Sequence, residues 1–252
     1  MAGMDADYLA RIVGATGIPE AYLKYDTVLS DFISMFFSSA KDSSLDIVLY
    51  GGTAMNRGFF KEKQRLSVDL DLETGSDAKT EASRISGMLS RRGISCETPP
   101  NAPGLVIARA GEGVRIRVEV TAKKFNIETK AIDLVPLSGY LGLPSAITYG
   151  VPSYPFDYLM ARKLNALSRR LIYKDIYDVF IGLDMARKSA LKRYVKMVGG
   201  DFDIIGDVLH YLRGGAFDKK DPFGYRSLTQ LRYRKSEDFM ANEIVSRLER
   251  IF

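Results

Sequence analysis

The alternation of apolar and polar positions predicts strands in the first half of the chain, set between helices. A strand is indicated where a short β-branched run ends at glycine, or where apolar residues recur at every second position. These strands are expected at 46–50, 66–72, 105–109, 114–120 and 131–135. The glycine-rich segment 110–113 predicts a hairpin between two of them. Helices are expected within 1–40 and at 77–92, the latter capped by Asp77.

The second half is predicted to be helical after residues 136–155, a segment rich in Pro, Gly and Ser that we interpret as a linker. Helices are expected at about 156–171, 175–187, 189–198, 202–213 and 237–251. The predicted fold class is therefore α+β. A mixed β-sheet flanked by helices forms the N-terminal domain, residues 1–145, and an α-helical domain follows at 146–252.

Composition places the chain among ordinary globular proteins, with 252 residues, 46% hydrophobic and 27% charged. Cys96 is the single cysteine, so an internal disulfide is excluded and a reducing compartment is suitable. The N-terminus lacks the pattern of a secretory signal, and no apolar run reaches the roughly 18 residues of a membrane span. We expect a cytoplasmic protein with no membrane partner.

Charge is unevenly distributed along the chain. Residues 1–150 contain 17 Lys and Arg against 18 Asp and Glu, whereas residues 151–252 contain 19 against 13. The positive excess of the second half is typical of a surface that faces a polyanion such as RNA. An ordinary set of solvated helix faces would give the same excess.

Asp69 and Asp71 are the first candidates for chemistry. In the alternating segment 66–72 they point to the same face of the strand, roughly 6.6–6.8 Å apart along it. Two carboxylates on one face suit Mg²⁺, which prefers hard oxygen ligands and shares them with substrate phosphates. A solvent-exposed acidic strand face is the alternative.

Two further segments favour a metal and phosphate site. Gly51, Gly52 and Thr53 stand between a predicted strand and a predicted helix, where glycine lets the backbone approach a phosphate closely. Glu119 lies on the alternating strand 114–120 and would supply a third carboxylate if that strand neighbours the first. The alternative to a metal-binding role is that Glu119 forms an ion pair with Arg115 or Arg117.

The second half adds a basic helix. Residues 162–174 contain five basic side chains and no acid, and Lys163 and Arg170 share one helix face. Asp175 and Asp178 follow on one face of the next helix. We interpret Asp175 as the cap of that helix, and pairing of Asp178 with a lysine is an alternative to a functional role.

In this order, the motifs resemble those of the AbiEii/MenT nucleotidyltransferase toxins, within the polymerase-β-like superfamily. The resemblance runs from about residue 47 to about residue 185. It is carried by Gly51-Gly52-Thr53-Ala54, Arg65-x-Ser67-x-Asp69-x-Asp71, Glu119, the helix around Lys163, and Lys174-Asp175-Ile176-Tyr177-Asp178. The segment between Gly52 and Asp69 is slightly longer than the usual pattern.

The resemblance implies a nucleotidyltransferase-type sheet and a role for each matched residue. Asp69 and Asp71, with Glu119, correspond to ligands of Mg²⁺, with Mn²⁺ as an alternative. The NTP would contact Gly51, Gly52, Thr53, Arg65, Ser67 and Lys163. Asp178 would be an acid near the nucleotide, and Asp69, Asp71, Lys163 and Asp178 would form the catalytic set.

The function expected from the resemblance is transfer of an NMP from an NTP to an RNA acceptor such as tRNA. A toxin of this kind has a cognate antitoxin as its partner and acts in a toxin–antitoxin or phage-defence system. Two alternatives stay open: a non-catalytic nucleic-acid-binding or partner-binding protein on the same fold, and nucleotide transfer to a protein hydroxyl.

Overall fold

The computed structural model describes residues 6–111, 113–215 and 225–252. These residues form two compact units. Unit 1 contains the chain up to Ala15 and Pro19–Tyr154, and unit 2 contains Thr16–Ile18 and the described part of Pro155–Phe252. The chain therefore passes from unit 1 to unit 2 between Tyr154 and Pro155, whereas the sequence suggested a boundary after residue 145.

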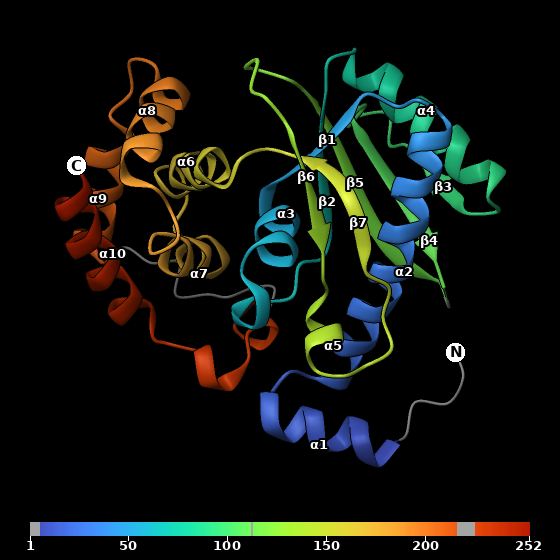
Figure 1. The fold of residues 1–252 in the computed structure, drawn as a ribbon, viewed down its shortest axis with the longest axis horizontal. Coiled ribbons are helices and arrows are strands. Elements are labelled where there is room, and N and C mark those ends of the chain that lie inside the picture. The colour runs from blue at the N-terminus through green and yellow to red at the C-terminus, as the bar shows by residue number, and fades with distance from the viewer. Residues whose placement is uncertain (1–5, 112, 216–224) are drawn as a thin grey trace. The chain divides into compact units, whose positions relative to one another are not determined.

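A mixed sheet forms the centre of unit 1 (Figure 1). Its strands are β1 (Ile47–Tyr50), β2 (Asp69–Thr74), β3 (Ser95–Glu97), β4 (Leu105–Ala110), β5 (Val114–Ala122), β6 (Lys130–Leu134) and β7 (Thr148–Ser153). The strand order is β3-β4-β5-β2-β1-β7-β6. The pairs β2–β5 and β1–β7 are parallel and the other pairs are antiparallel, so the fold class is α+β as the sequence predicted.

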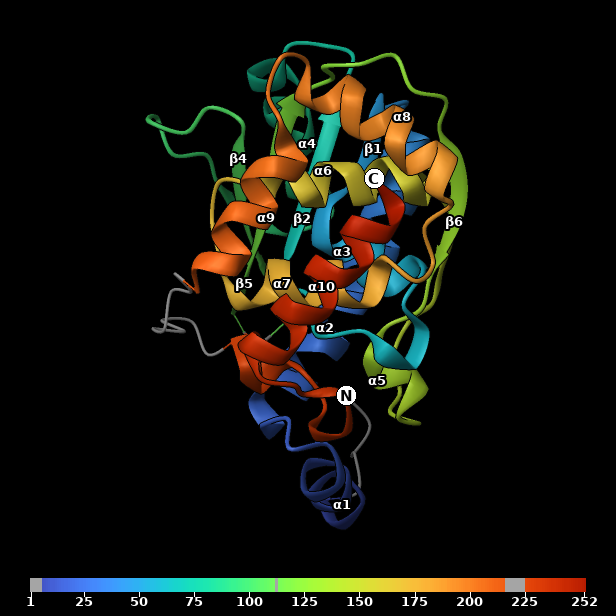
Figure 2. The same ribbon diagram turned by 90° about the vertical axis from the view of Figure 1, so that its left-hand side faces the viewer.

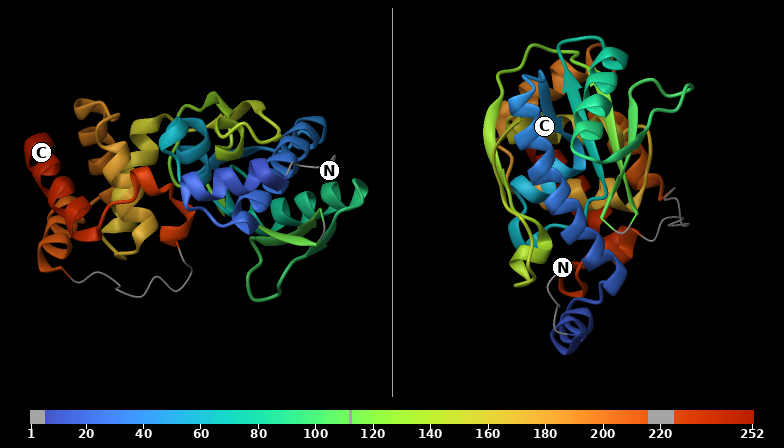
Figure 3. Two further views of the ribbon diagram at one scale, coloured as in Figure 1. Left: turned by 90° about the horizontal axis from the view of Figure 1, so that it is seen from below. Right: turned by 90° about the vertical axis from the view of Figure 1, so that its right-hand side faces the viewer.

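Helices α2 (Glu20–Asp42) and α4 (Ala78–Arg91) cover one face of this sheet (Figures 1 and 3). Their buried side chains, among them Phe36 and Ile85, pack in one core with Leu70, Leu72 and Val118 of the strands. Burial of each such side chain is worth about 1.5–3 kcal/mol. Because side chains alternate along a strand, Asp69, Asp71 and Glu119 must lie on the opposite face, which we call the polar face.

Three shorter or outer helices complete unit 1. They are α1 (Ala6–Thr16), α3 (Gly51–Gly58) and α5 (Leu137–Tyr140), with the 3₁₀ turn Lys61–Lys63 after α3. Asp77 caps α4 by accepting a hydrogen bond from the Thr80 amide at 2.8 Å, as predicted. The predicted hairpin at 110–113 is confirmed by the antiparallel pairing of β4 and β5.

Two predictions about local structure need correction. The strand expected at 66–72 begins at Asp69 and continues to Thr74, where Tyr154 donates a hydrogen bond to buried Glu73 at 2.7 Å. The segment 136–155 contains α5 and strand β7, which pairs with β1 and β6, and is not a simple linker. Pro, Gly and Ser mark turns equally well inside a domain, and long-range pairing decided the difference.

Unit 2 is helical in its described part (Figure 2). Its helices are α6 (Phe156–Leu167), α7 (Tyr173–Gly182), α8 (Lys188–Gly199), α9 (Ile204–Gly214) and α10 (Glu237–Ile251), with 3₁₀ turns at Tyr225–Leu228 and Leu231–Tyr233. Helix α6 packs on α7 and α8, and α10 packs on α7 and α9. The predicted order of helices is confirmed, although α6 ends four residues earlier than residue 171.

Candidate active site

Asp69, Asp71 and Glu119 come together on the polar face of the sheet. Asp69 and Asp71 lie on β2, and the parallel pairing of β2 with β5 puts Glu119 directly beside Asp71. The two aspartates are partly exposed and Glu119 is exposed. We refer to these three as the β2/β5 carboxylates. The condition set by the sequence, that the two strands be neighbours, is fulfilled.

The alternative role of Glu119 as an ion-pair partner is not what the structure shows. Arg115 lies 3.7 Å from Glu97 on β3 instead. Within the described part of the chain, neither Glu119 nor Asp69 forms an ion pair. Asp69 and Glu119 therefore have no ion-pair partner among the described residues that would offset their negative charge.

The Gly51-Gly52 turn brings backbone against this cluster. Helix α3 begins at Gly51, whose φ of +72° is a conformation that favours glycine. A Cβ atom at Gly51 would overlap the Asp71 carboxylate, since it would lie 2.9 Å from the carboxyl carbon. A Cβ at Gly52 would lie 2.9 Å from Arg65 Nη2 and 3.4 Å from Ser67 Oγ. Glycine at both positions lets the Asp71 carboxylate and the Arg65 guanidinium lie close to the backbone of the turn.

Thr53 and Ser67 support this turn from beneath. Their hydroxyl oxygens are 2.8 Å apart, and Thr53 also donates a hydrogen bond to the backbone carbonyl of Asp69. Both residues are buried. The hydroxyl of Thr53 is thus engaged in fixing the start of β2 relative to α3, which places Asp69.

Arg65 is held in place by hydrogen bonds to Asn56 and to the backbone. Its amide donates to Asn56 Oδ1 at 2.9 Å, and its Nη1 donates to the Leu66 carbonyl at 3.0 Å. Asn56 in turn donates to the Gly52 carbonyl at 3.0 Å. Arg65 is buried beside the Gly52 turn, so its charge lies next to the predicted phosphate position.

Tyr25 is a residue that the sequence did not single out. Its hydroxyl donates to the Val68 carbonyl at 2.8 Å, immediately before Asp69. Burial, followed by the negative charge of Asp69, raises the pKa of Tyr25 to about 12. Its position within the apolar pattern of α2 gave no signal of this contact.

Lys163, Asp175 and Asp178 form a buried ion-pair cluster inside unit 2, the Lys163 triad. Lys163 Nζ lies 2.9 Å from Asp175 Oδ1 and 3.0 Å from Asp178 Oδ2, and the exposed fractions of the three side chains are 8%, 0% and 0%. Arg170 Nε donates to the other oxygen of Asp175 at 2.8 Å. The alternative that Asp178 pairs with a lysine is what the structure shows.

The interpretation of Asp175 as a helix cap is wrong. Ile172 is the cap residue of α7, with no side-chain cap bond, and Asp175 points inward from the first turn. Burial raises the pKa of Asp175, but the charges of Lys163 and Arg170 outweigh burial and hold this pKa below its usual value. Local sequence allowed a cap, and tertiary contact with α6 decided against it.

The carboxylate oxygens on the polar face are suitable ligands for a divalent cation whose remaining ligands come from the substrate. Among the residues that the structure describes, no group of three His, Cys, Asp or Glu side chains forms a ready-made metal site. Mg²⁺ usually takes one or two carboxylates and completes its shell with water and phosphate oxygens. The Asp71 carboxylate lies against Gly51 at the start of α3, where backbone amides can bind phosphate, and this agrees with such a shared site.

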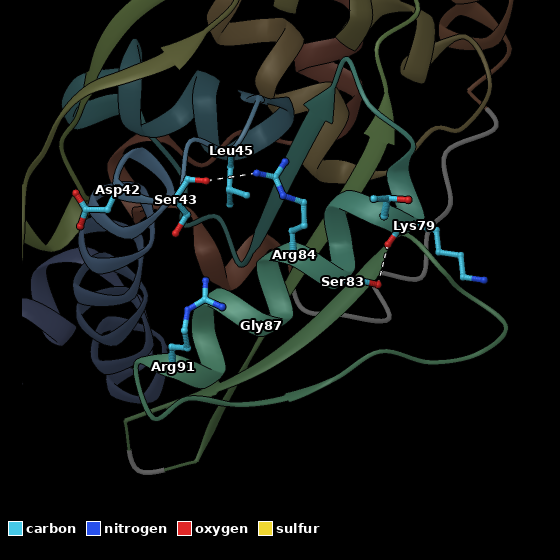
Figure 4. A pocket seen from close by; sticks show the side chains of 9 residues that line it. Asp42, Ser43, Leu45, Lys79, Ser83, Arg84, Gly87 and Arg91 are labelled. Carbon is cyan, nitrogen blue, oxygen red and sulfur yellow. Dashed lines mark hydrogen bonds between the residues drawn. The ribbon is translucent and has the colours of Figure 1, made fainter.

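A cavity of about 950 Å³ lies elsewhere in unit 1, at the end of α2 and along α4 (Figure 4). Lys79, Arg84 and Arg91 are among its lining residues. Arg84 already has partners within the protein, because it donates hydrogen bonds to Glu81 at 2.9 Å and to the Ser43 carbonyl at 3.3 Å. The cavity is on the helix-covered side of the sheet and contains none of the predicted site residues.

Comparison with known proteins identifies relatives of the whole fold. A family model described as "Nucleotidyl transferase AbiEii toxin, Type IV TA system" matches residues 35–249. MenT4, a nucleotidyltransferase toxin from Mycobacterium tuberculosis, has a similar structure, with a TM-score of 0.68, 14% identity, and coverage of 99% of this chain and 90% of that chain. JHP933 from Helicobacter pylori is similar with a TM-score of 0.51 and 14% identity, over 99% of this chain and 93% of its own. No curated protein matches this sequence.

None of the described helices is both long enough and apolar enough to cross a bilayer.

Proposed function

Since the chain belongs to the AbiEii nucleotidyl transferase toxin family, a family of transferases, we propose that it transfers an NMP from an NTP to an RNA acceptor. The reaction depends on a divalent cation, Mg²⁺ with Mn²⁺ as an alternative. The observation that carries the proposal is the close approach of the Gly51-Gly52 turn to Asp71 and Ser67. Glycine at the turn lets the Asp71 carboxylate lie against the start of α3, and a second carboxylate, Glu119, is the strand neighbour of Asp71.

In the proposed reaction a hydroxyl oxygen of the acceptor attacks the α-phosphorus of the NTP. A new P–O bond forms, the bond between the α- and β-phosphates breaks, pyrophosphate leaves, and the hydroxyl proton passes to solvent or base. A divalent cation, when bound, supplies charge neutralisation for the phosphates, and Asp69 and Asp71, with Glu119, would hold it. The rate enhancement comes mainly from positioning and electrostatics.

The residues around the turn have separate roles in this proposal. Gly51 and Gly52 let the first amides of α3 face the triphosphate. Ser67 and Arg65 offer a hydroxyl and a positive charge next to Gly52, while Thr53 fixes the start of β2. These roles place the phosphates on the β1 side of the aspartates.

Lys163 and Asp178 are proposed as nucleotide-binding and catalytic residues of unit 2. Two of the three donors of the Lys163 ammonium are used by Asp175 and Asp178. A phosphate bound by Lys163 would therefore compete with these carboxylates for the positive charge of the ammonium group. The triad also has a structural role, which stability measurements on its variants separate from the catalytic one.

Incubation of the protein with each labelled NTP, total RNA and total protein tests the proposal. We expect Mg²⁺-dependent labelling of the RNA fraction, with tRNA as the first acceptor to examine. The double variant Asp69→Ala, Asp71→Ala should lose labelling while it keeps its unfolding transition. Labelling by the double variant would refute the role of the aspartates, and labelling of protein alone would refute the RNA acceptor.

We further propose that the protein acts as the toxin of a toxin–antitoxin or phage-defence pair. Induced expression should arrest growth of the host cell, and the double variant should not. Co-expression of the adjacent gene product should restore growth if that product is the antitoxin. Equal arrest by wild type and the double variant would show that toxicity does not come from nucleotide transfer.

A further inference from the structure

A row of three arginines crosses the polar face of the sheet and begins at the β2/β5 carboxylates. Arg117 of β5 is the strand neighbour of Asp69. Arg115 lies two residues before it on the same strand and therefore on the same face. Arg109 of β4 is the strand neighbour of Arg115. All three are exposed, and we call them the arginine row.

Among the described residues, Glu97 is the only ion-pair partner of the arginine row. Arg109 lies 2.5 Å from one carboxylate oxygen of Glu97, and Arg115 lies 3.7 Å from the other. Arg117 forms no ion pair with any residue in the described ranges. Exposed pairs of this kind contribute little to stability and exchange readily with solvent ions. The row can therefore present positive charge to a ligand at little cost to folding.

The strand order separates this row from the proposed triphosphate position. In the order β4-β5-β2-β1, the Gly51-Gly52 turn follows β1, on one side of the aspartates, and the arginine row occupies β5 and β4, on the other side. A triphosphate at the turn is compact and leaves the far end of the row unused. Only an extended polyanion that reaches the aspartates from the β5 side would contact all three arginines.

We propose that the arginine row binds successive phosphates of the acceptor RNA strand next to its reacting end. This inference rests on the proposed function, because it takes RNA to be the acceptor. The guanidinium fork matches the geometry of phosphate oxygens. Arg117 and Arg115 are separated by roughly 6.6–6.8 Å along the strand, which is comparable with the spacing of phosphates in an extended single strand.

Glu97 limits the affinity of this surface in the proposal. The hydrogen bond from Arg109, followed by the charge of Arg109, holds the pKa of Glu97 below its usual value, so Glu97 stays ionised. Its charge competes with phosphate for two members of the row. Removal of this charge should therefore strengthen RNA binding, whereas a merely structural role of the arginines predicts no gain.

Binding of a fluorescein-labelled single-stranded RNA, measured by anisotropy over a salt series, tests the proposal without turnover. Every measurement uses the full chain carrying Asp69→Ala and Asp71→Ala. Each arginine that no longer binds a phosphate should lower the affinity about fivefold at about 0.1 M salt and decrease the log–log salt slope by about 0.7. Addition of Arg115→Gln and Arg117→Gln should thus cost about 25-fold and reduce the slope by about 1.4.

Two further variants sharpen the result. Glu97→Gln should raise the affinity severalfold. Arg91→Gln is the matched control, because Arg91 lines the cavity on the helix-covered side and forms no ion pair with a described residue. It should leave both affinity and salt slope unchanged.

An unchanged salt slope in the double arginine variant, or no gain from Glu97→Gln, would overturn the proposal. Competition by poly-glutamate as strong as that by unlabelled RNA would also overturn it, in favour of an acidic protein. Failure of the proposed function is recognised separately. If the wild-type protein labels no RNA but the arginine variants lose RNA binding, the proposed function fails and the row remains an RNA-binding surface.

Discussion

The β2/β5 carboxylates of unit 1 and the carboxylates of the Lys163 triad in unit 2 have opposite electrostatic surroundings. Asp175 and Asp178 are fully buried, and Lys163 and Arg170 neutralise them at distances of 2.8–3.0 Å. Asp69 and Glu119 lie on an accessible face and form no ion pair within the described ranges. The Lys163 triad is therefore neutralised within unit 2, whereas Asp69 and Glu119 can accept a cation from outside. We therefore expect the Lys163 triad to contribute to stability and the β2/β5 carboxylates to contribute to ligand binding.

Loss of the Lys163 charge should have the largest effect on stability. Lys163→Met leaves two buried carboxylates without their shared partner, and we expect a loss of about 3–5 kcal/mol in the free energy of unfolding. Chemical denaturation of the full chain measures it. The triple variant Lys163→Met, Asp175→Asn, Asp178→Asn should recover most of the loss, because it removes the uncompensated charges as well. A small loss of unfolding free energy in Lys163→Met would show that the triad contributes no more to stability than the carboxylates of unit 1.

Asp69→Asn should greatly reduce activity while it leaves stability nearly unchanged. Transfer of labelled nucleotide should fall at least about 10²–10³-fold, the scale of removing one preorganised electrostatic group. The free energy of unfolding should stay within about 1 kcal/mol of wild type or increase, since a repulsive charge is removed. A loss of several kcal/mol would show that Asp69 is structural and would remove the contrast between the two clusters.

The stability that Asp175 contributes should also depend on pH. The folded-state pKa of Asp175 is depressed, so its contribution to stability is present above its unfolded pKa, near 3.9, and is lost as pH falls through the folded value. Asp175→Asn should therefore flatten the dependence of unfolding free energy on pH below about 4. Asp69→Asn serves as the comparison in the same measurement. Identical acid limbs for wild type and Asp175→Asn would contradict the assigned pKa direction.

Arg170→Ala should have the smallest effect. The Arg170 side chain is 54% exposed, and Lys163 still neutralises Asp175 in its absence. We expect a loss of about 1 kcal/mol or less in unfolding free energy. Thermal unfolding beside Lys163→Met measures the difference. A loss as large as that of Lys163→Met would show that Arg170 is the main partner of the buried carboxylate.

Much of the local structure could be predicted because it depends on neighbouring residues. Alternation predicted the β4–β5 hairpin, and the Asp77 cap of α4 is formed within one helical turn. The same alternation put Asp69 and Asp71 on one face, and glycine at 51 and 52 predicted a turn after β1. These features require no contact with distant parts of the chain.

Other features could not be read locally because they depend on residues far apart in sequence. Strand β7 lies in a segment whose composition resembles a linker, and only its pairing with β1 and β6 makes it a strand. Tyr25 supports the start of β2 from α2, across 43 positions of sequence. Asp175 stood at the predicted start of a helix, where a cap is expected, but its side chain binds Lys163, 12 residues earlier.

The sequence by itself determined the acidic pair, the glycine turn and the helices of unit 2, because each is encoded by residues that are close together along the chain. Tertiary structure alone decided which charges are neutralised. Parallel pairing of β2 and β5 put Glu119 beside Asp71 and Arg117 beside Asp69, while β3 brought Glu97 to Arg109 and Arg115. The physical reason is that ion pairs form through space over a few ångströms, and only the folded chain sets which side chains come that close.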